Sequence, residues 1–564
     1  MSAELSVALI PILGGLAAAF VPLAARRWLL LALPCLTLAA LLALEPGASI
    51  RLALFGFELE PMRVDGLSLI FGYVFCVAAF LNVLFAWHAV QGVEQPAGMV
   101  YAGAAIGAVF AGDLLTLFVY WEATAVASAL VIWARGGNRA WRAGMRYIVV
   151  QLASGMLLAA GAAIQYAQTG SLQFAQTGLA APGAALLFIA FGIKAAFPLL
   201  HNWLQDSYPE ASPTGTVVLS AFTTKLGIYA LARAFPGTEE LIWIGTVMAA
   251  FPIFYAVIEN DLRRVLAYSV NNQLGFMVVG IGIGTELAIN GAVAHAFADI
   301  LFKALLFMSM GAVLFRTGTA NGSDLGGLYK SMPWTTGFCM VGAASISAFP
   351  LFSGFVTKSM IMTSAAAEGY SGVWLVLLFA SAGVFHHAGI KIPYFAFFSH
   401  DSGIRCKEAP INMLLAMGIA AALCVGIGVM PQALYALLPY PVDYVPYTMS
   451  HVVSQLQLLV FSALAFAVLM RTGIYPPELR AINLDFDWFY RRPAVSLARG
   501  LIELDGRVRA RLGALIEQAG RIGLRRLERA SGPDGLFERS SLSGRMALWV
   551  MVMLLAYLVM YHAT

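Results

Sequence analysis

Five of the seven lysines in this chain fall inside long apolar stretches, where a charged side chain is costly to hold. Arginine provides almost all of the other basic residues, and an arginine cannot release its proton, whereas a buried lysine can. The distribution therefore predicts a series of proton-carrying lysines within a membrane. Snorkelling from helix ends is the alternative for any one of them. The five are Lys194, Lys225, Lys303, Lys358 and Lys391.

Glu122 lies in the middle of an apolar stretch, in the run Tyr120-Trp121-Glu122. A carboxylate at that depth needs a partner or a proton, and we expect Lys194 to be the partner. At an effective dielectric constant near 20, a pair about 4 Å apart interacts by about 4 kcal/mol, which is enough to load or unload a proton. We favour a switchable pair; a static ion pair between two helices is the alternative.

His295, Asp299 and Lys303 recur every four residues, which places all three on one face of a helix. Three titratable groups on one face predict a proton wire, in which the Asp299 carboxylate keeps Lys303 charged. His386 and His387 have no carboxylate at metal-ligand spacing, so we expect them to be structural or peripheral rather than a zinc site.

Lys391, His201 and Asp206 are further candidates for proton transfer. Lys391 follows the second broken helix as Lys225 follows the first, so the two match by position. Asp206 is either a proton-uptake group or a solvated loop residue. Asp113 opens an apolar stretch, and we expect it to be a helix N-cap rather than a proton carrier.

The elements that must hold these side chains are membrane-spanning helices. The chain has 564 residues, of which 60% are hydrophobic and 11% charged, and its mean hydropathy is +0.80. Soluble domains carry about 25% charged residues, so the composition excludes a set of water-soluble domains. Apolar stretches of about 17 to 25 residues predict about sixteen spanning helices and an all-α polytopic membrane protein.

The spans divide into six segments. We expect N-terminal helices over residues 1–95, a first five-helix repeat over 96–235, a second and inverted five-helix repeat over 236–400, and further core helices over 401–475. An amphipathic segment then covers residues 476–540, and a last spanning helix covers 541–564.

Two copies of Ala-Phe-Pro-Leu, at residues 196–199 and 348–351, support the repeat. They lie an odd number of spans apart, so the two copies should run in opposite directions through the membrane. Each proline removes a backbone hydrogen bond and should break its helix, the seventh and the twelfth in order. Irregular backbone at that depth is tolerated only beside protein or a wet cavity, as in transporters.

The basic residues also predict the orientation. With the N-terminus outside, the predicted outer loops hold only Arg51, Arg63 and Arg233, and the inner side holds the other loop arginines. Both chain ends are then predicted to be periplasmic, in a bacterial cytoplasmic membrane. The five cysteines lie far apart and form no C-x-x-C pair, so we expect no metal, no cofactor and no disulfide framework.

The segment after the core helices predicts a lateral helix on the inner membrane surface. We expect lipid or a neighbouring subunit to hold it, with a simple lipid anchor as the alternative. A helix of about 37 residues, roughly 55 Å long, would reach the next subunit. Apolar residues step along it by three, four or seven, and arginines lie on the opposite face: Leu501, Val508, Leu512, Leu515, Ala519 and Ile522, against Arg507, Arg511, Arg521 and Arg525.

Six runs in a fixed order resemble the antiporter-like membrane subunits shared by respiratory complex I and Mrp-type sodium/proton antiporters. The resemblance covers about residues 60–470 and implies a core of about fourteen helices with two inverted five-helix repeats, broken in helices seven and twelve. The runs are Tyr120–Glu122, Lys194–Trp203, Pro213–Tyr229, Asn260–Ser269, Phe302–Phe307 and Phe352–Lys358.

The resemblance also implies roles for single residues. Lys358 matches a terminal lysine, which is similar to the Mrp D-type subunit and to the distal subunit of complex I. The other matches are Glu122 and Lys194 to the family's glutamate–lysine pair, Lys225 to its connecting lysine, and His295 and Lys303 to its central relay.

Two departures from the family pattern stand out. Asp299 replaces a histidine that the family usually has. Gln205 and Tyr208 stand where proline and histidine are frequent, which affects the uptake side.

We therefore expect a proton-translocating subunit of a multi-subunit Na+/H+ antiporter of the Mrp D type. Its partners would be other membrane subunits, lipid, protons and Na+, and no nucleic acid. The first alternative is a proton-pumping membrane subunit of a redox-driven complex, such as an NADH:quinone oxidoreductase or a membrane-bound hydrogenase, with no redox or hydrolytic chemistry in this chain. The second is a non-conducting membrane scaffold, which five intramembrane lysines argue against. The coupling ion and the transport direction stay open.

Overall fold

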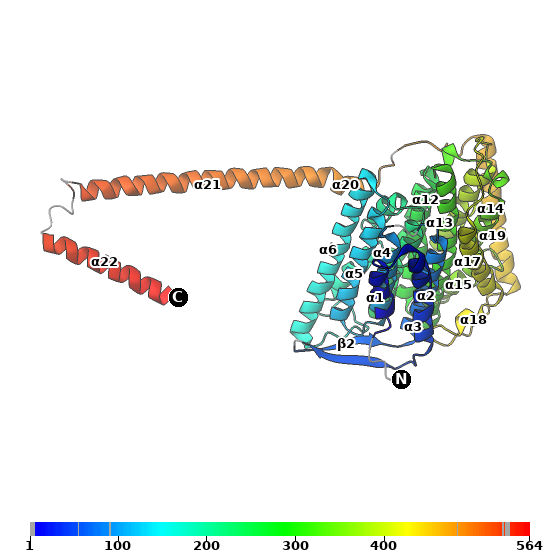
Figure 1. Cartoon of the computed structure of the whole chain (residues 1–564), viewed down its shortest axis with the longest axis horizontal. Helices are drawn as coiled ribbons and strands as arrows, with labels where there is room; N and C mark the ends of the chain where they lie inside the picture. Colours follow the sequence, from blue (N-terminus) through cyan, green and yellow to red (C-terminus); the bar gives the residue numbers. More distant parts are fainter. Residues whose placement is uncertain are drawn as a thin grey trace. The chain divides into compact units, whose positions relative to one another are not determined.

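The structure is a computed structural model that describes residues 6–54, 56–89, 92–481, 483–532, 535 and 542–563. The chain separates into two compact units, Met1–Asn483 and Leu484–Thr564. Figure 1 shows the first unit as a bundle of long, roughly aligned helices. The polytopic helical membrane fold predicted from composition is confirmed.

The first unit holds its helices in two halves along the chain. The first half contains α1 (Leu9–Ala18), α2 (Leu23–Leu42), α3 (Gly66–Phe85), α4 (Glu94–Phe110), α5 (Leu114–Trp133), α6 (Gly137–Thr169), α7 (Ala184–Lys194), α8 (Asn202–Ser207), η1 (Tyr208–Glu210), α9 (Gly215–Ala221) and α10 (Thr223–Ala234). The second half contains α11 (Glu239–Ile258), α12 (Leu262–Ile283), α13 (Glu286–Thr317), η2 (Gly322–Asp324), η3 (Leu328–Lys330), α14 (Pro333–Ile346), α15 (Ser353–Ala367), α16 (Ser371–Val384), η4 (Phe385–Lys391), η5 (Tyr394–Phe398), α17 (Ile411–Val429), α18 (Gln432–Tyr435) and α19 (Met449–Thr472).

Within the described ranges, eleven helices are long and apolar enough to cross a membrane. Other apolar helices are shorter, and α7 is one of them because the chain breaks after Lys194. The predicted breaks in the seventh and twelfth spans are therefore present, between α7 and α8 and between α14 and α15. The total of sixteen spans and the inverted orientation of the two repeats stay predictions.

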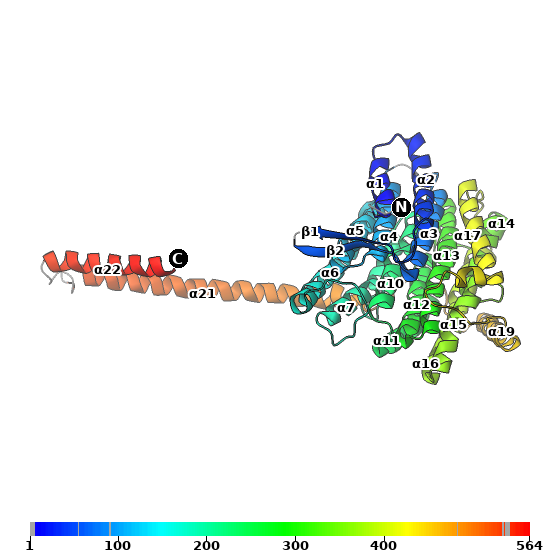
Figure 2. The ribbon, with the colours of Figure 1, turned by 90° about the horizontal axis from the view of Figure 1, so that it is seen from below.

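A β-hairpin near the N-terminus was missed by the all-α prediction. β1 (Ser49–Leu54) pairs antiparallel with β2 (Phe57–Arg63). It lies across one end of the bundle, and β2 contacts α4 and α5 (Figures 1 and 2). The alternation of Ile50, Leu52 and Leu54 with other residues favours a strand, but a window long enough to detect a spanning helix averages over it.

Asp113 caps α5, as the sequence predicts. Its Oδ1 accepts a hydrogen bond from the Thr116 backbone N–H at 2.7 Å, and its Oδ2 accepts one from the Glu60 backbone N–H at 2.8 Å. The cap therefore satisfies an unpaired donor of the helix and also fixes β2 to the start of α5.

The second unit contains α20 (Asp487–Arg491), α21 (Pro493–Ser531) and α22 (Leu542–Ala563). The predicted lateral helix corresponds to α21, an unbroken helix of 39 residues, which at 1.5 Å per residue is about 58 Å long. Its apolar residues Leu501, Leu512 and Leu515 are exposed in this single chain. Its attachment to a membrane surface or to a neighbouring subunit stays a prediction.

Candidate functional site

The five lysines are buried inside the bundle. A snorkelling lysine would carry its ammonium to a surface, so burial favours proton carriers in the protein interior. The exposed fraction is 3% for Lys358 on α15 and zero for Lys194 on α7, Lys225 on α10, Lys303 on α13 and Lys391 on η4.

The two Ala-Phe-Pro-Leu copies break their helices with the same backbone conformation. The alanine and the leucine of each copy are left-handed: φ is 59° at Ala196, 71° at Leu199, 55° at Ala348 and 74° at Leu351. Within the described part of the chain, no other non-glycine residue has a positive φ. Each such residue costs roughly 1–3 kcal/mol, so the surrounding structure must hold both breaks in place.

The backbone hydrogen bonds of the two breaks repeat as well. In the first, Phe197 N–H donates to the Gly192 carbonyl at 2.9 Å and Ala196 N–H donates to the Ile193 carbonyl at 3.1 Å, which is a Schellman helix end. The same two bonds, 3.0 and 3.1 Å long, form the second break at Ala348. Alanine occupies the left-handed position that glycine usually holds.

Glu122 and Lys194 lie close in the fold but do not form the direct ion pair predicted from the sequence. Lys194 Nζ donates to the Trp121 carbonyl at 3.0 Å and to Thr124 Oγ1 at 2.6 Å, one residue before and two residues after Glu122. Glu122 Oε1 is buried against Gly155 of α6, without a hydrogen-bond partner in the described structure. Because Lys194 Nζ is held by the residues on either side of Glu122 in α5, a small shift of either side chain would change their pairing.

Lys225 and Asp299 form a buried ion pair between the two halves of the bundle. Lys225 Nζ lies 2.7 Å from Asp299 Oδ2, and neither side chain is exposed. The sequence predicts that Asp299 acts on Lys303 of the same helix. In the structure, the short contact of Asp299 is with Lys225 instead, because α10 packs against α13 at this face.

His295 has a partner on each side of its ring. Nδ1 lies 3.0 Å from Thr357 Oγ1 on α15, and Nε2 lies 3.0 Å from Gln273 Oε1 on α12. Lys303 Nζ, two turns further along α13, is buried and has no hydrogen-bond partner among the described residues. A buried ammonium without an acceptor is costly, so Lys303 is well placed to give up a proton.

The Lys358 side chain, which belongs to α15, reaches the C-terminal end of α14, the half-helix before the second break. Its Nζ donates to the carbonyl of Ile346, the last residue of α14, at 3.3 Å, and it lies 4.8 Å from the centre of the Phe276 ring. The C-terminal end of a helix carries partial negative charge, which favours a cation there. The second break therefore supplies electrostatic stabilisation for the terminal lysine.

Lys391 is also in a buried ion pair. Its Nζ lies 2.9 Å from Glu478 Oε1 and donates to the carbonyls of Val257 and Glu259, each at 2.7 Å. Lys225 and Lys391 thus both pair with a carboxylate, which agrees with their predicted match; their equivalence in an inverted repeat stays a prediction. Glu478 was not predicted from the sequence, because this residue follows the last core span and has no spacing that relates it to Lys391.

His201 and Asp206 are both held by neighbours. Asp206 lies in α8 and accepts two hydrogen bonds from Arg146 of α6, at 2.6 and 2.9 Å, so the interpretation as a solvated loop residue is wrong. His201 is buried, and its ring centre lies 4.7 Å from that of Phe251. A role for either residue in proton uptake stays a prediction.

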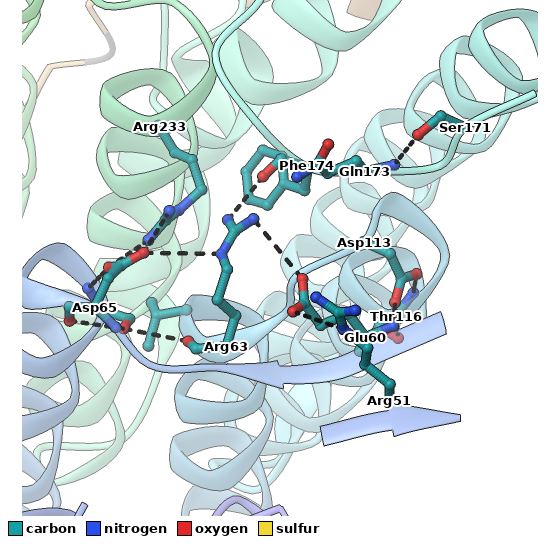
Figure 3. Close-up of polar contacts among 12 residues, drawn as sticks. Arg51, Glu60, Arg63, Asp65, Asp113, Thr116, Ser171, Gln173, Phe174 and Arg233 are labelled. Carbon is teal, nitrogen blue, oxygen red and sulfur yellow. Dashed lines mark hydrogen bonds and ion pairs between the residues drawn. The ribbon is translucent and has the colours of Figure 1, made fainter. Parts of the chain in front are cut away.

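The three arginines assigned to the outer loops meet in one network that the sequence did not predict (Figure 3). Arg233 Nη1 lies 2.8 Å from Asp65 Oδ2, and Arg63 lies 3.8 Å from Asp65 and 4.0 Å from Glu60. Arg51 reaches Glu60 at 4.0 Å. The network joins β2 to the start of α3 and the end of α10. It depends on the hairpin, which explains why the sequence did not reveal it.

The long apolar helices and the two breaks define the class of this protein: a multi-pass membrane protein with discontinuous helices. Across the described ranges, no cluster of three or more His, Cys, Asp or Glu side chains could hold a metal ion.

Comparisons with known proteins identify the family. Residues 111–386 match the membrane region of the NADH:quinone oxidoreductase/Mrp antiporter family. The N subunit of the NADH-quinone oxidoreductase of Desulforudis audaxviator is 30% identical over 419 residues, which cover 66% of this chain and 83% of that protein. The D-type subunit of the Na(+)/H(+) antiporter of Alkalihalophilus pseudofirmus is 33% identical over 309 residues, which cover 50% of this chain and 62% of that protein. The chain belongs to the NADH:quinone oxidoreductase/Mrp antiporter family.

A solved structure shares the fold. A chain of the membrane-bound sulfane sulfur reductase, an archaeal respiratory membrane complex, superposes with a TM-score of 0.71 at 24% identity, covering 98% of this chain and 99% of that one. Among curated relatives, the chain spans 52% to 64% of the length of the first four that it matches.

Proposed function

We propose that this chain is the proton-translocating subunit of a multi-subunit monovalent cation/proton antiporter of the Mrp D type. The observation that carries the proposal is the set of five buried lysines, with the Lys225–Asp299 ion pair between the two halves. The 33% identity to the D-type subunit of an Na(+)/H(+) antiporter supports this type. A lysine at the terminal position, Lys358, is also similar to the residue found there in D-type subunits.

In the proposed cycle, a proton passes from the region of Glu122 and Lys194 through Lys225 and the α13 face to Lys358. Asp299 is the counter-charge shared by two lysines, because it contacts Lys225 directly and stands one turn from Lys303. At an effective dielectric constant near 20, a pair about 4 Å apart gains about 4 kcal/mol. Movement of the Asp299 carboxylate from one lysine to the other would therefore drive a proton off the lysine that it leaves.

The test is proton movement in inverted membrane vesicles that contain the assembled complex. Addition of Na+ should dissipate a pre-formed pH gradient with the wild-type chain. The same vesicles with Lys303→Met, at equal complex content, should lose this response. An unchanged response in the Lys303→Met vesicles would contradict proton transfer through this chain.

A proton-pumping subunit of a redox-driven complex is the second candidate function. The relative that is 30% identical over 83% of its length is a subunit of NADH-quinone oxidoreductase, and this similarity favours the redox-driven alternative. Purification of a tagged chain in mild detergent separates the two candidates. Iron–sulfur or nickel proteins in the purified complex would select the redox machine, and only small hydrophobic subunits would select the antiporter.

We also propose that the protein lies in a bacterial cytoplasmic membrane with both chain ends on the periplasmic side, and that α21 contacts a neighbouring membrane subunit. The apolar residues exposed along α21 support a covered helix in the assembly. Labelling of single cysteines placed at each terminus with a membrane-impermeant maleimide tests the orientation.

A further inference from the structure

A second carboxylate–lysine pair lies where the chain leaves the last core helix. Lys391 ends η4, and Glu478 belongs to the segment that follows α19. Their side chains are 0% and 5% exposed, and Nζ and Oε1 are 2.9 Å apart. The next residues, Leu479 and Arg480, are exposed. Glu478 therefore lies at the boundary between the protein interior and its surface.

A buried histidine, His387, lies on the same element as Lys391. It stands four residues before Lys391 in η4 and is fully buried. Neither ring nitrogen makes a well-formed hydrogen bond among the described residues, although the Gly383 carbonyl, one turn earlier, lies within reach of the ring. Buried polar groups are nearly always well hydrogen-bonded, so a poorly satisfied imidazole one turn before Lys391 indicates a group that exchanges protons.

The backbone at this place is unusual as well. The residues from Phe385 to Lys391 form a π-helix, which contains His386, His387 and Lys391. Such wide turns are rare and occur frequently at functional sites. A regular α-helix would give these side chains a different angular spacing, so the π-helix sets their placement.

We infer that Lys391 and Glu478 are a further pair of proton-transfer residues, at the end of a branch that runs through His387 to the surface, and that the segment after α19 supplies its last carboxylate. The inference rests on the proposed proton-translocating function. In the transfer step, the Lys391 ammonium gives a proton to the Glu478 carboxylate, which leaves a neutral amine and a carboxylic acid. Glu478 then releases that proton at the surface. His387, protonated from the interior side, gives a proton to the neutral Lys391 amine and becomes a neutral imidazole.

Other charged and titratable groups surround the pair. The Glu259 carboxylate lies 3.8 Å from Arg264 and 3.3 Å from the Asn483 amide. The Tyr475 ring stacks on the His386 ring, with the ring centres 5.5 Å apart. Glu259 is thus a second carboxylate beside Lys391, and it is engaged by Arg264.

A static latch is the competing explanation. Arg480 lies 2.7 Å from Asp324, and Asn483 donates to Glu259, so the segment after α19 is tied to the bundle at three points. In that case Lys391 would need its positive charge but never its proton exchange.

The experiment measures Na+-driven proton flux per assembled complex in inverted vesicles that contain the whole complex. Lys391→Arg keeps the charge and the pairing with Glu478 but cannot release a proton. We expect its flux to fall about tenfold or more at normal complex yield, with a similar loss in Glu478→Gln and partial recovery in Glu478→Asp. Arg480→Gln is the matched control, because it removes a latch contact without removing a proton carrier, and it should keep its flux.

Full flux in Lys391→Arg would overturn the inference and select the latch. If Lys391→Arg fails to assemble, His387→Gln decides: reduced flux supports the branch, and full flux overturns it. Lys194→Arg separates this test from that of the proposed function. If Lys194→Arg stops flux while Lys391→Arg does not, only this inference fails; if both retain flux, the proposed function fails too.

Discussion

The ammonium of Lys225 lies 2.7 Å from the Asp299 carboxylate, and this contact joins α10 of the first half of the bundle to α13 of the second. Asp299 stands one turn from Lys303 on α13, so one carboxylate lies near two lysines. In the structure its close contact is to Lys225, and Lys303 Nζ has no hydrogen-bond partner among the described residues. The position of the carboxylate therefore determines which half of the bundle holds the compensated charge.

Asp299→Asn should leave Lys225 buried without its counter-charge. If Lys225 remains charged, the cost is about 3 to 5 kcal/mol, so both the assembled yield and the flux should fall. The double variant Lys225→Met with Asp299→Leu removes both charges and should recover yield but not flux. Size-exclusion chromatography and vesicle flux measure the two effects. Normal flux in the double variant would show that the pair is only structural.

Lys194→Arg should stop proton flux with normal assembly, because arginine keeps the charge but does not release a proton. Glu122→Gln should also stop it, since Lys194 then loses its electrostatic partner. Thr124→Val is the control: it removes the hydroxyl 2.6 Å from Lys194 Nζ but no titratable group, and its flux should fall only partly. An active Lys194→Arg complex would reduce Glu122 and Lys194 to a structural pair.

Gly155→Ala should displace the Glu122 carboxylate. A Cβ at Gly155 would lie 1.4 Å from Glu122 Oε1, so the side chain must move away from α6. We expect a clear loss of flux with little loss of yield, because the far end of a flexible side chain can shift. Gly337→Ala, with no atom within 4 Å of its new Cβ, is the matched control and should have normal flux. Normal flux in Gly155→Ala would show that the exact place of the carboxylate is unimportant.

Ala348→Val should destabilise the second break, because a β-branched residue fits the left-handed region poorly. We expect a loss of about 1 kcal/mol or more, seen as a lower melting temperature of the purified protein. Ala348→Gly should be tolerated, since glycine adopts this conformation without strain. Ala366→Val, at an exposed position of α15, controls for the general effect of valine. A stable Ala348→Val protein would mean that the break can be rebuilt in another conformation.

Asp65 should make the stability of the protein depend on pH in the acid range. Burial works against ionisation of Asp65, but the hydrogen bond and charge of Arg233 outweigh it and hold the pKa of this carboxyl below its usual value. Stability from such a group is present above the unfolded pKa of about 3.9 and is lost as the pH falls through the folded value. Asp65→Asn should thus be less stable than wild type at neutral pH, and the difference should shrink below about pH 4.

Thermal unfolding of Asp65→Asn across pH checks this prediction. Glu58→Gln, at an exposed position of β2, is the control. Asp65 also caps α3, because its Oδ1 accepts a hydrogen bond from the Ser68 backbone N–H at 2.9 Å. A difference between Asp65→Asn and wild type that does not change with pH would assign the effect to this cap alone.

Local signals in the sequence were sufficient for the helical bundle, the two breaks and the Asp113 cap. The proline of each Ala-Phe-Pro-Leu copy ends its helix, whereas Pro252, which also follows Ala-Phe, lies inside the continuous helix α11. A carboxylate at a helix start finds the nearest backbone donors. The buried lysines also follow from local composition, because a charge within an apolar stretch must be placed inside the protein.

Pairing between distant residues could not be predicted in the same way. Asp299 has Lys303 one turn away in the sequence, yet its short contact is to Lys225, because the packing of α10 on α13 decides which ammonium is nearer. The link between Glu478 and Lys391 likewise depends on the path of the chain after α19. The β-hairpin was missed because its short alternation has no weight in a search for spanning helices.

Four of the five buried lysines donate to a backbone carbonyl: Lys194 to Trp121, Lys225 to Ser220, Lys358 to Ile346, and Lys391 to Val257 and Glu259. An amide oxygen does not take up a proton at physiological pH, and no side-chain substitution removes it. Part of the electrostatic environment of these lysines therefore does not change with pH, and alanine scanning does not detect it. Only a change of the main chain itself, such as an ester in place of an amide at Ile346, would reveal how much each proton carrier depends on it.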